Sequence, residues 1–212
     1  MLKNIYFILL FILTSCSVQK TQNEKDLRNG DLIFVEAKEE NLSGAINRVT
    51  QKTETAKFDH LGLVEITPNG IFVLHASPKL GSAKESLKDF YEKNRANQQQ
   101  MVIYRLKKDY QSAIPDAIEQ ANLMLNKPYN FTYILNDDSY YCSDFVERAF
   151  RNFVIFEHIP MNFKNKDGQI DSFWVDFYEK QNLDVPQDQP GTNPNQLAES
   201  DKLIRLGKFQ IK

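Results

Sequence analysis

The sequence predicts a single α+β domain in which a mostly antiparallel sheet packs against helices. Three observations support this expectation. Apolar runs of strand length recur along the chain, a Pro-Asn-Gly turn joins two of them, and other segments have the 3.6-residue apolar periodicity of amphipathic helices. The chain has 212 residues, 42% of them hydrophobic and 25% charged, which fits one globular domain better than two.

Five apolar segments are expected to form strands. By residue number they are 30–35, 57–66, 71–76, 101–106 and 202–209. Pro68 and Asn69 have the residue types of a hairpin turn between the second and third strands, with Gly70 as a bulge. This register places His75 opposite Gly62. Because His60 shares the face of Gly62, the two imidazoles become diagonal neighbours, whereas a slip of one residue would put them on opposite faces.

Helical periodicity predicts helices over residues 41–49, 87–91 and 117–125, and a further helix from Ser143 onward. Pro115 suits the first turn of the third of these helices. Residues 129–141 form an aromatic stretch without periodicity, so we expect it to be irregular. Cys142 therefore lies at the start of a helix.

The charge balance argues against polyanionic partners. Lys and Arg number 26 and Asp and Glu 28, for a formal net charge of −2 and an isoelectric point near 6.0. No basic field points to nucleic acid or to an anionic lipid surface.

The first residues resemble a bacterial lipoprotein signal. An apolar run over residues 5–13, too short to span a bilayer, leads into Leu13-Thr14-Ser15-Cys16. We expect residues 1–15 to be a signal peptide, Cys16 to be lipidated as a membrane anchor, and 16–27 to be a polar tether before a domain over 28–212. The alternative is a plain secretory signal in which Cys16 has no role. The lipoprotein signal predicts a protein of the cell envelope that is lipid-anchored to a membrane, as a periplasmic or outer-membrane lipoprotein.

Cys142 is then a lone thiol in an exported protein, since the chain has two cysteines. It could be an inert buried residue or a nucleophile. A helix N-terminus favours the thiolate and offers backbone N–H groups for an oxyanion. Asp137, Asp138 and Asp144 would oppose this if they faced the sulfur, but their positions suit caps and first-turn acids.

Three histidines could serve as the base. His158 lies in a loop-like stretch and suits a surface role. His60 and His75 could each be ordinary core residues, but two histidines on one sheet face beside a helix-start cysteine favour catalysis. The spacings do not fit a zinc site, so we expect no metal and no cofactor.

Several segments together resemble the permuted papain-like amidases of the NlpC/P60 superfamily, in the YiiX/YebB-like group. They are Gly30–Phe34, Phe58–Val64, Leu74–Ala76, Lys127–Asn130, Tyr141–Val146 and Gly191–Pro194 with Leu197. The resemblance implies a papain-like core in circularly permuted order, with Cys142 as nucleophile, His60 as general base and His75 as the third, orienting member. That third position usually holds glutamate. Histidine occurs there in the lecithin retinol acyltransferase-like relatives.

The resemblance also implies that Tyr129 and Tyr141 are candidates to line the substrate cleft, with packing as the alternative for Tyr129. The expected reaction is hydrolysis of an amide or peptide bond, on a substrate such as a peptidoglycan stem peptide. Two alternatives stay open: a lipid-directed thiol acyltransferase or lipase of the same fold, and a non-catalytic peptide-binding lipoprotein. A thiol redox role lacks a resolving cysteine.

Overall fold

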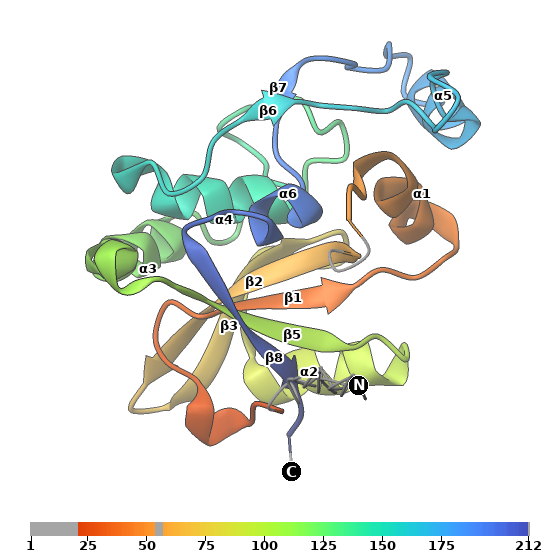
Figure 1. The fold of residues 1–212 in the computed structure, drawn as a ribbon. Coiled ribbons are helices and arrows are strands. Elements are labelled where there is room, and N and C mark those ends of the chain that lie inside the picture. The colour runs from red at the N-terminus through yellow and green to blue at the C-terminus, as the bar shows by residue number, and fades with distance from the viewer. Residues whose placement is uncertain (1–20, 54–56, 212) are drawn as a thin grey trace, which may run out of the picture.

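The structure is a computed structural model that describes residues 21–53 and 57–211. A six-stranded antiparallel sheet forms its centre, in the order β4-β3-β2-β1-β5-β8 (Figure 1). The strands are β1 (Leu32–Glu36), β2 (Phe58–Thr67), β3 (Gly70–Ser77), β4 (Gly81–Ser86), β5 (Met101–Leu106) and β8 (Leu203–Phe209). The predicted signal peptide (1–15) and the lipidation of Cys16 lie outside the described residues.

Helices cover both faces of the sheet, which confirms the predicted α+β class (Figure 1). Helix α2 (Leu87–Ala96) packs on one face, against β3 and β4. Helices α3 (Ile114–Leu123) and α4 (Cys142–Phe150) pack on the other, where α4 contacts β2 and β3. On the same side of the sheet as α4, α1 (Asn41–Thr50) and α6 (Pro194–Ala198) also contact β2. Farther from the sheet lie α5 (Ser172–Glu179) and the short pair β6 (Ile159–Pro160) and β7 (Pro190–Gly191).

Alternation along the strands divides the apolar core between the two faces. Leu61 and Leu74 pack with α3 and α4, whereas Val64 and Val73 pack with Phe90 of α2. Both clusters are nearly excluded from solvent. Consequently each strand residue near the start of β2 faces either α4 or α2.

The β2–β3 hairpin has the predicted two-residue turn and register. Thr67 pairs with Gly70 and Leu63 pairs with Leu74. Continuing the same register by one residue places His75 beside Gly62. The predicted bulge at Gly70 is wrong, because no register shift occurs along this pair. The predicted pairing of the strands is nevertheless correct, because a two-residue turn gives the same register without a bulge.

A bulge does occur near the start of β2. Val35 pairs with His60 and Glu36 with Phe58, so Asp59 is the extra residue. The N–H of Phe58 then donates to the side chain of Asn195 at 2.6 Å, and the Asn195 amide donates to Thr50 Oγ1 at 2.9 Å. Asn195 is fully buried. It therefore joins α6, α1 and the beginning of β2.

Two segments differ from the expectations. Residues 81–86, for which no strand was predicted, form β4, and α2 continues to Ala96, past the predicted end at residue 91. Residues 22–27, assigned to the tether, instead pack on the domain: Gln22 N–H donates to Lys208 O at 2.7 Å, and Leu27 is buried. The segment was predicted to be a tether because it is polar, but its one apolar residue, Leu27, is buried against the domain.

Among the described residues, no helix is both long and apolar enough to cross a membrane.

Candidate active site

Cys142 is the first residue of α4, as predicted. Its N-cap, Tyr141, makes no side-chain capping bond, so the first N–H groups of the helix are not capped by a side chain. The residue is 4% exposed. Its thiol donates to the backbone carbonyl of Asp59 over 3.7 Å, so the sulfur rests against the bulge of β2.

The thiol is held protonated in this arrangement. Burial, the largest cause, and the nearby carboxylate of Asp59 together raise the pKa of Cys142 to about 12, although the backbone N–H groups of Ser143, Leu61 and Cys142 itself lower it. Burial also raises the pKa of Asp59, to about 6, although hydrogen bonds from Ser43 and Gln99 oppose this. The helix start alone thus does not activate the sulfur.

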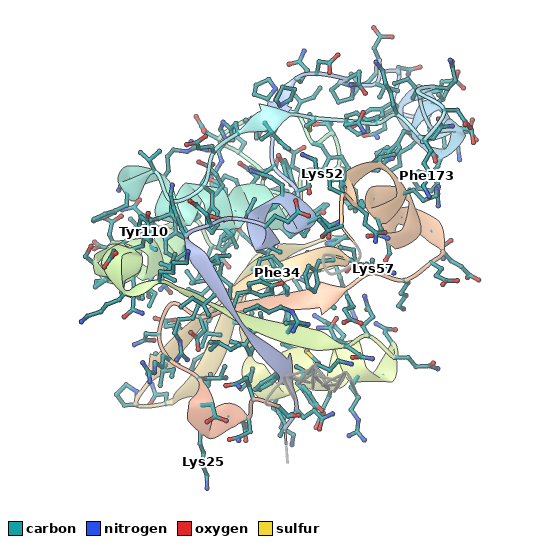
Figure 2. All side chains as sticks on the ribbon, in the orientation of Figure 1. Lys25, Phe34, Lys52, Lys57, Tyr110 and Phe173 are labelled. Carbon is teal, nitrogen blue, oxygen red and sulfur yellow. The ribbon has the colours of Figure 1, made fainter. Side chains whose placement is uncertain are left out.

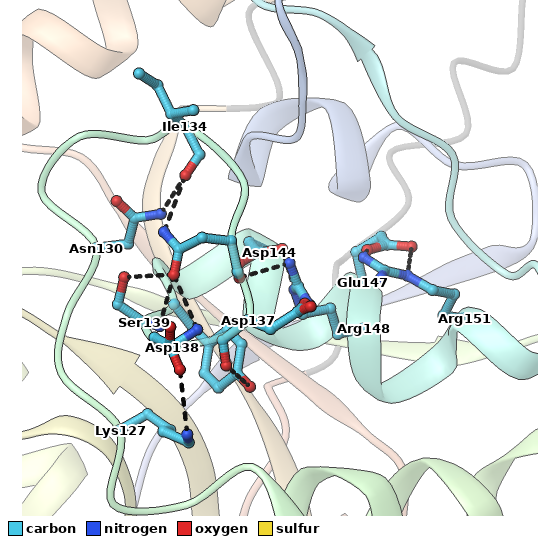
Figure 3. A network of polar contacts seen from close by, with 12 residues as sticks. Lys127, Asn130, Ile134, Asp137, Asp138, Ser139, Asp144, Glu147, Arg148 and Arg151 are labelled. Carbon is cyan, nitrogen blue, oxygen red and sulfur yellow. Dashed lines mark hydrogen bonds and ion pairs between the residues drawn. The ribbon is translucent and has the colours of Figure 1, made fainter.

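The acids near the helix start are paired with basic side chains; Asp144 is a first-turn acid of α4, as predicted, but no side chain caps the helix. Arg148 binds Asp144 at 2.7 Å and Asp137 at 2.7 Å, and it also donates to the carbonyl of Asn136 at 2.8 Å (Figure 3). Asp138 is exposed and lies 3.8 Å from Lys127. This network ties the irregular segment before Cys142 to α4 and keeps these carboxylates out of the contacts of the sulfur.

His60 and His75 form the predicted pair. Their rings are joined by a 3.0 Å contact between His60 Nε2 and His75 Nδ1. Both rings pack on Phe90 of α2, with centroids 5.9 Å and 5.2 Å away. Gly62 makes room for the pair, because a Cβ there would lie 3.2 Å from His75 Cβ and 2.3 Å from Val73 Cγ1.

Burial lowers the pKa of both histidines. For His60 the neighbouring His75 and Lys93 lower it further. For His75 the contact with Glu85 acts in the opposite direction without reversing the shift. Both imidazoles are therefore neutral near pH 7, the state in which a histidine can accept a proton.

The thiol and the histidine pair approach β2 from different sides. Cys142 belongs to the cluster on the α4 face, whereas His60 and His75 pack with Phe90 on the α2 face. Among the hydrogen bonds of the described residues, none joins Cys142 to His60, and the thiol bonds instead to the residue before it. The structure therefore brings the two histidines together and leaves the thiol beside the backbone of His60.

A narrow aromatic cavity opens beside the sulfur. Tyr129 and Tyr141, the two predicted cleft residues, both line it, together with Tyr133, Met161 and Trp174. Its volume is about 50 Å³, which is room for a few water molecules, since one water needs roughly 10–15 Å³. A larger hollow of about 250 Å³ adjoins His60, and Ile46, Asp59 and Tyr129 line both spaces.

Helices α1 and α5 close the aromatic cavity. Arg48 of α1 binds the N-cap of α5, Asp171, through two contacts of 3.0 Å and 3.2 Å. Figure 2 shows Phe173 projecting from α5 near α1. Trp174 and Tyr178 are buried between these elements. The sequence did not indicate this enclosure, because its aromatics come from three separate segments.

His158 lies apart from the thiol and the histidine pair. Its Nε2 is 3.1 Å from Glu147 Oε2, and the same carboxylate binds Arg151. Figure 3 shows the pair between Glu147 of α4 and Arg151, the residue that follows this helix. Within residues 21–53 and 57–211, no group of three or more His, Cys, Asp or Glu side chains is placed to hold a metal ion.

An antiparallel sheet with a cysteine-bearing helix on one face, and a histidine strand that precedes the cysteine in sequence, defines a papain-like fold in permuted order. The chain belongs to the family described as "Permuted papain-like amidase enzyme, YaeF/YiiX, C92 family", whose profile matches residues 26–207.

Among solved structures, the chain resembles the one titled metalloprotein yiiX from Escherichia coli O157:H7, with a TM-score of 0.65 and 21% identity over 85% of this chain and 97% of that one. This likeness supports the fold. No curated protein matches the chain.

Proposed function

We propose that this amidase family member hydrolyses an amide or peptide bond through a thioester, with Cys142 as nucleophile, His60 as general base and His75 as the residue that orients His60. One observation carries the proposal. The thiol bonds to the residue before His60 in β2, and the His60 ring is hydrogen-bonded to a second imidazole. A nucleophile, a base and an orienting group thus converge on one short stretch of strand.

The proposed steps follow from these roles. His60 takes the thiol proton, and the sulfur adds to the amide carbonyl carbon, while the N–H groups at the start of α4 bind the oxyanion. The C–N bond then breaks as His60 returns the proton to the leaving amine. Water, deprotonated by His60, attacks the thioester, and the carbonyl–sulfur bond breaks to regenerate the thiol.

The structure supports a resting state for this cycle. The thiol is protonated and donates to the backbone carbonyl of Asp59. Before substrate binds, catalytic hydrogen bonds are often long or poorly aligned. Productive chemistry then requires the His60 ring to approach the sulfur. Because Asp59 lines both the cavity at Cys142 and the hollow at His60, this residue stands where that approach must occur.

The proposed substrate is a peptidoglycan stem peptide, cleaved by a lipoprotein of the NlpC/P60 superfamily anchored through Cys16 in the cell envelope. Support comes from the sequence, where an apolar run ends at Leu13-Thr14-Ser15-Cys16. Mass spectrometry of the lipidated N-terminal peptide from the native host tests the anchor. An unmodified Cys16 in the membrane fraction would contradict it.

One observation favours the lipid-directed alternative. The cavity at the sulfur is lined chiefly by apolar and aromatic side chains, among them Tyr133, Met161 and Trp174. Such a lining suits an acyl chain or an aromatic group better than a charged peptide. The same thiol chemistry would then act on an acyl–lipid bond.

Product analysis separates these candidates. The protein and its Cys142→Ser variant are incubated in parallel with muropeptides, with phospholipids and with N-acyl lipids, and products are identified by mass spectrometry. We expect new amide-cleavage products from muropeptides with the native thiol only. Products from lipids alone would support the acyltransferase or lipase. Ligand binding that is equal in both forms, with no products, would support a binding protein.

A further inference from the structure

The histidine pair continues into a charged chain on the α2 face of the sheet. His75 Nε2 lies 3.1 Å from Glu85 Oε2 of β4, although the approach is not aligned as an ideal hydrogen bond. The same oxygen lies 2.7 Å from Lys93 Nζ of α2. Together with the 3.0 Å contact to His60, four side chains from four elements form one polar series.

The strand register explains this placement. His75 pairs with Ala83 and Val73 pairs with Glu85, so Glu85 is the diagonal neighbour of His75 on the same face. His75 is fully buried, and the Glu85 side chain is 14% exposed. A buried imidazole nitrogen facing a carboxylate at this distance has no better partner for its proton among the described residues.

We propose that Glu85 is a positioning residue that sets the proton arrangement of the His60–His75 pair and thereby leaves His60 Nδ1 free to act as the base. This inference rests on the proposed function for its catalytic meaning, but the proton arrangement can be measured independently of activity.

The two rings have four nitrogens, and each neutral ring carries a proton on one of its two. An ionised carboxylate can only accept, so Glu85 selects the form of neutral His75 that carries its proton on Nε2. His75 Nδ1 then carries a lone pair and accepts a hydrogen bond from His60 Nε2–H across the 3.0 Å contact. A neutral His60 with its proton on Nε2 has an unprotonated Nδ1. Without Glu85, the opposite arrangement would put a proton on His60 Nδ1 and block its function as a base.

The charge on Glu85 persists at neutral pH. Burial works to raise the pKa of Glu85, but the contacts with His75 and Lys93 outweigh it and hold this pKa below the ordinary value. The charged or titratable groups facing His75 are Glu85 from β4, His60 from β2 and Lys93 from α2. When His60 becomes an imidazolium, the carboxylate behind His75 stabilises it, which two neutral imidazoles alone would do less well.

Histidine tautomers report the arrangement directly. We would record two-bond ¹H–¹⁵N correlations of the imidazoles in ¹⁵N-labelled protein near pH 8, assigned with His→Gln variants. The chain has three histidines, and His158 serves as an internal reference. The native protein should show His60 and His75 both protonated on Nε2. Glu85→Gln should give a mixture of tautomers in both rings and leave His158 unchanged.

A matched control exists on the same sheet. Glu65 is 13% exposed and pairs with Lys84 of β4 at 2.6 Å, much as Glu85 pairs with Lys93, but it touches neither histidine. Glu65→Gln should leave all three rings unchanged. If Glu85→Gln fails to fold, Lys93→Met provides a second test, because it keeps the carboxylate and should keep the native tautomers, and Glu85→Asp should retain the native tautomer in part.

The effect on reactivity is measured as the rate at which an activated ester acylates Cys142. Glu85→Gln should slow this step by about 10- to 100-fold, less than the ~10⁴-fold loss typical when the carboxylate bonded directly to a catalytic histidine is neutralised. Unchanged tautomers in Glu85→Gln, or equal changes in Glu65→Gln, would overturn the inference. A tautomer change with acylation that is independent of His60 would instead overturn the proposed function and leave the role of Glu85 standing.

Discussion

The two sides of β2 differ in what they provide. On the α4 side, the sulfur of Cys142 lies among aromatic side chains and beside a carboxyl group, an environment that favours the neutral thiol. On the α2 side, His60, His75, Glu85 and Lys93 form a hydrogen-bonded and ion-paired series. The proposed base, His60, is thus held in an ordered series in the resting protein, whereas the proposed nucleophile, Cys142, is a neutral thiol. The proposed mechanism therefore requires the His60 ring and the sulfur of Cys142 to come together when substrate binds.

The largest expected effect comes from disturbing the ordered side. A methyl group at Gly62 would lie 2.3 Å from Val73 Cγ1 and 3.2 Å from His75 Cβ, so Gly62→Ala should displace the His75 strand. Overpacking of this kind costs about 1–3 kcal/mol of unfolding free energy. Urea unfolding measures the loss, and the imidazole spectra should show a weakened His60–His75 contact. Native stability with an unchanged spectrum would show that the pair does not depend on this close approach.

A smaller effect is expected from the carboxyl group beside the thiol. Asp59→Asn removes a charge that raises the pKa of Cys142, although burial, the larger cause, remains. Alkylation of Cys142 by iodoacetamide, followed on its tryptic peptide, should accelerate about 3- to 10-fold near pH 8. Because the pKa of Asp59 is about 6, native protein and variant should converge as pH falls below that value. Equal alkylation rates at pH 8 would show that the charge of Asp59 does not influence the Cys142 thiol.

The smallest effect concerns access to the aromatic cavity. Arg48→Met should loosen the contact between α1 and α5 and speed alkylation of Cys142 by about 2- to 5-fold. The Arg48 side chain is 48% exposed, so the unfolding free energy should change by less than about 1 kcal/mol. Lys88→Met, in an exposed pair with Glu92, is the control. The same rate in both variants would mean that α1 and α5 do not limit entry.

Much of the α2 side could be predicted from residue types in sequence. The hairpin register followed from the length of the Pro68–Asn69 turn, and the space for two rings followed from Gly62. Glu85 could not be foreseen, because Gly81–Ser86 is an edge strand whose sequence lacks the apolar alternation of a buried strand. Its identity as a strand depends on pairing with β3, which is a tertiary property.

The α4 side was less predictable. The position of Cys142 at a helix start followed from the apolar periodicity after it. The raised pKa of its thiol did not, because it depends on burial and on Asp59, a residue that the β2 bulge brings near the sulfur. Asn195, which accepts the Phe58 N–H at this bulge, lies 137 positions away in sequence, and no local pattern marks such a contact.

Acylation by p-nitrophenyl acetate tests the central claim most directly, because it needs no knowledge of the natural substrate. The release of nitrophenolate is followed in a stopped-flow instrument, and the acetylated cysteine is located by peptide mass spectrometry. The account predicts a burst with acetyl on Cys142, no burst in Cys142→Ser, and an acylation rate lowered about 10²- to 10⁴-fold in His60→Ala. Acylation of Cys142 at the native rate in His60→Ala would contradict it.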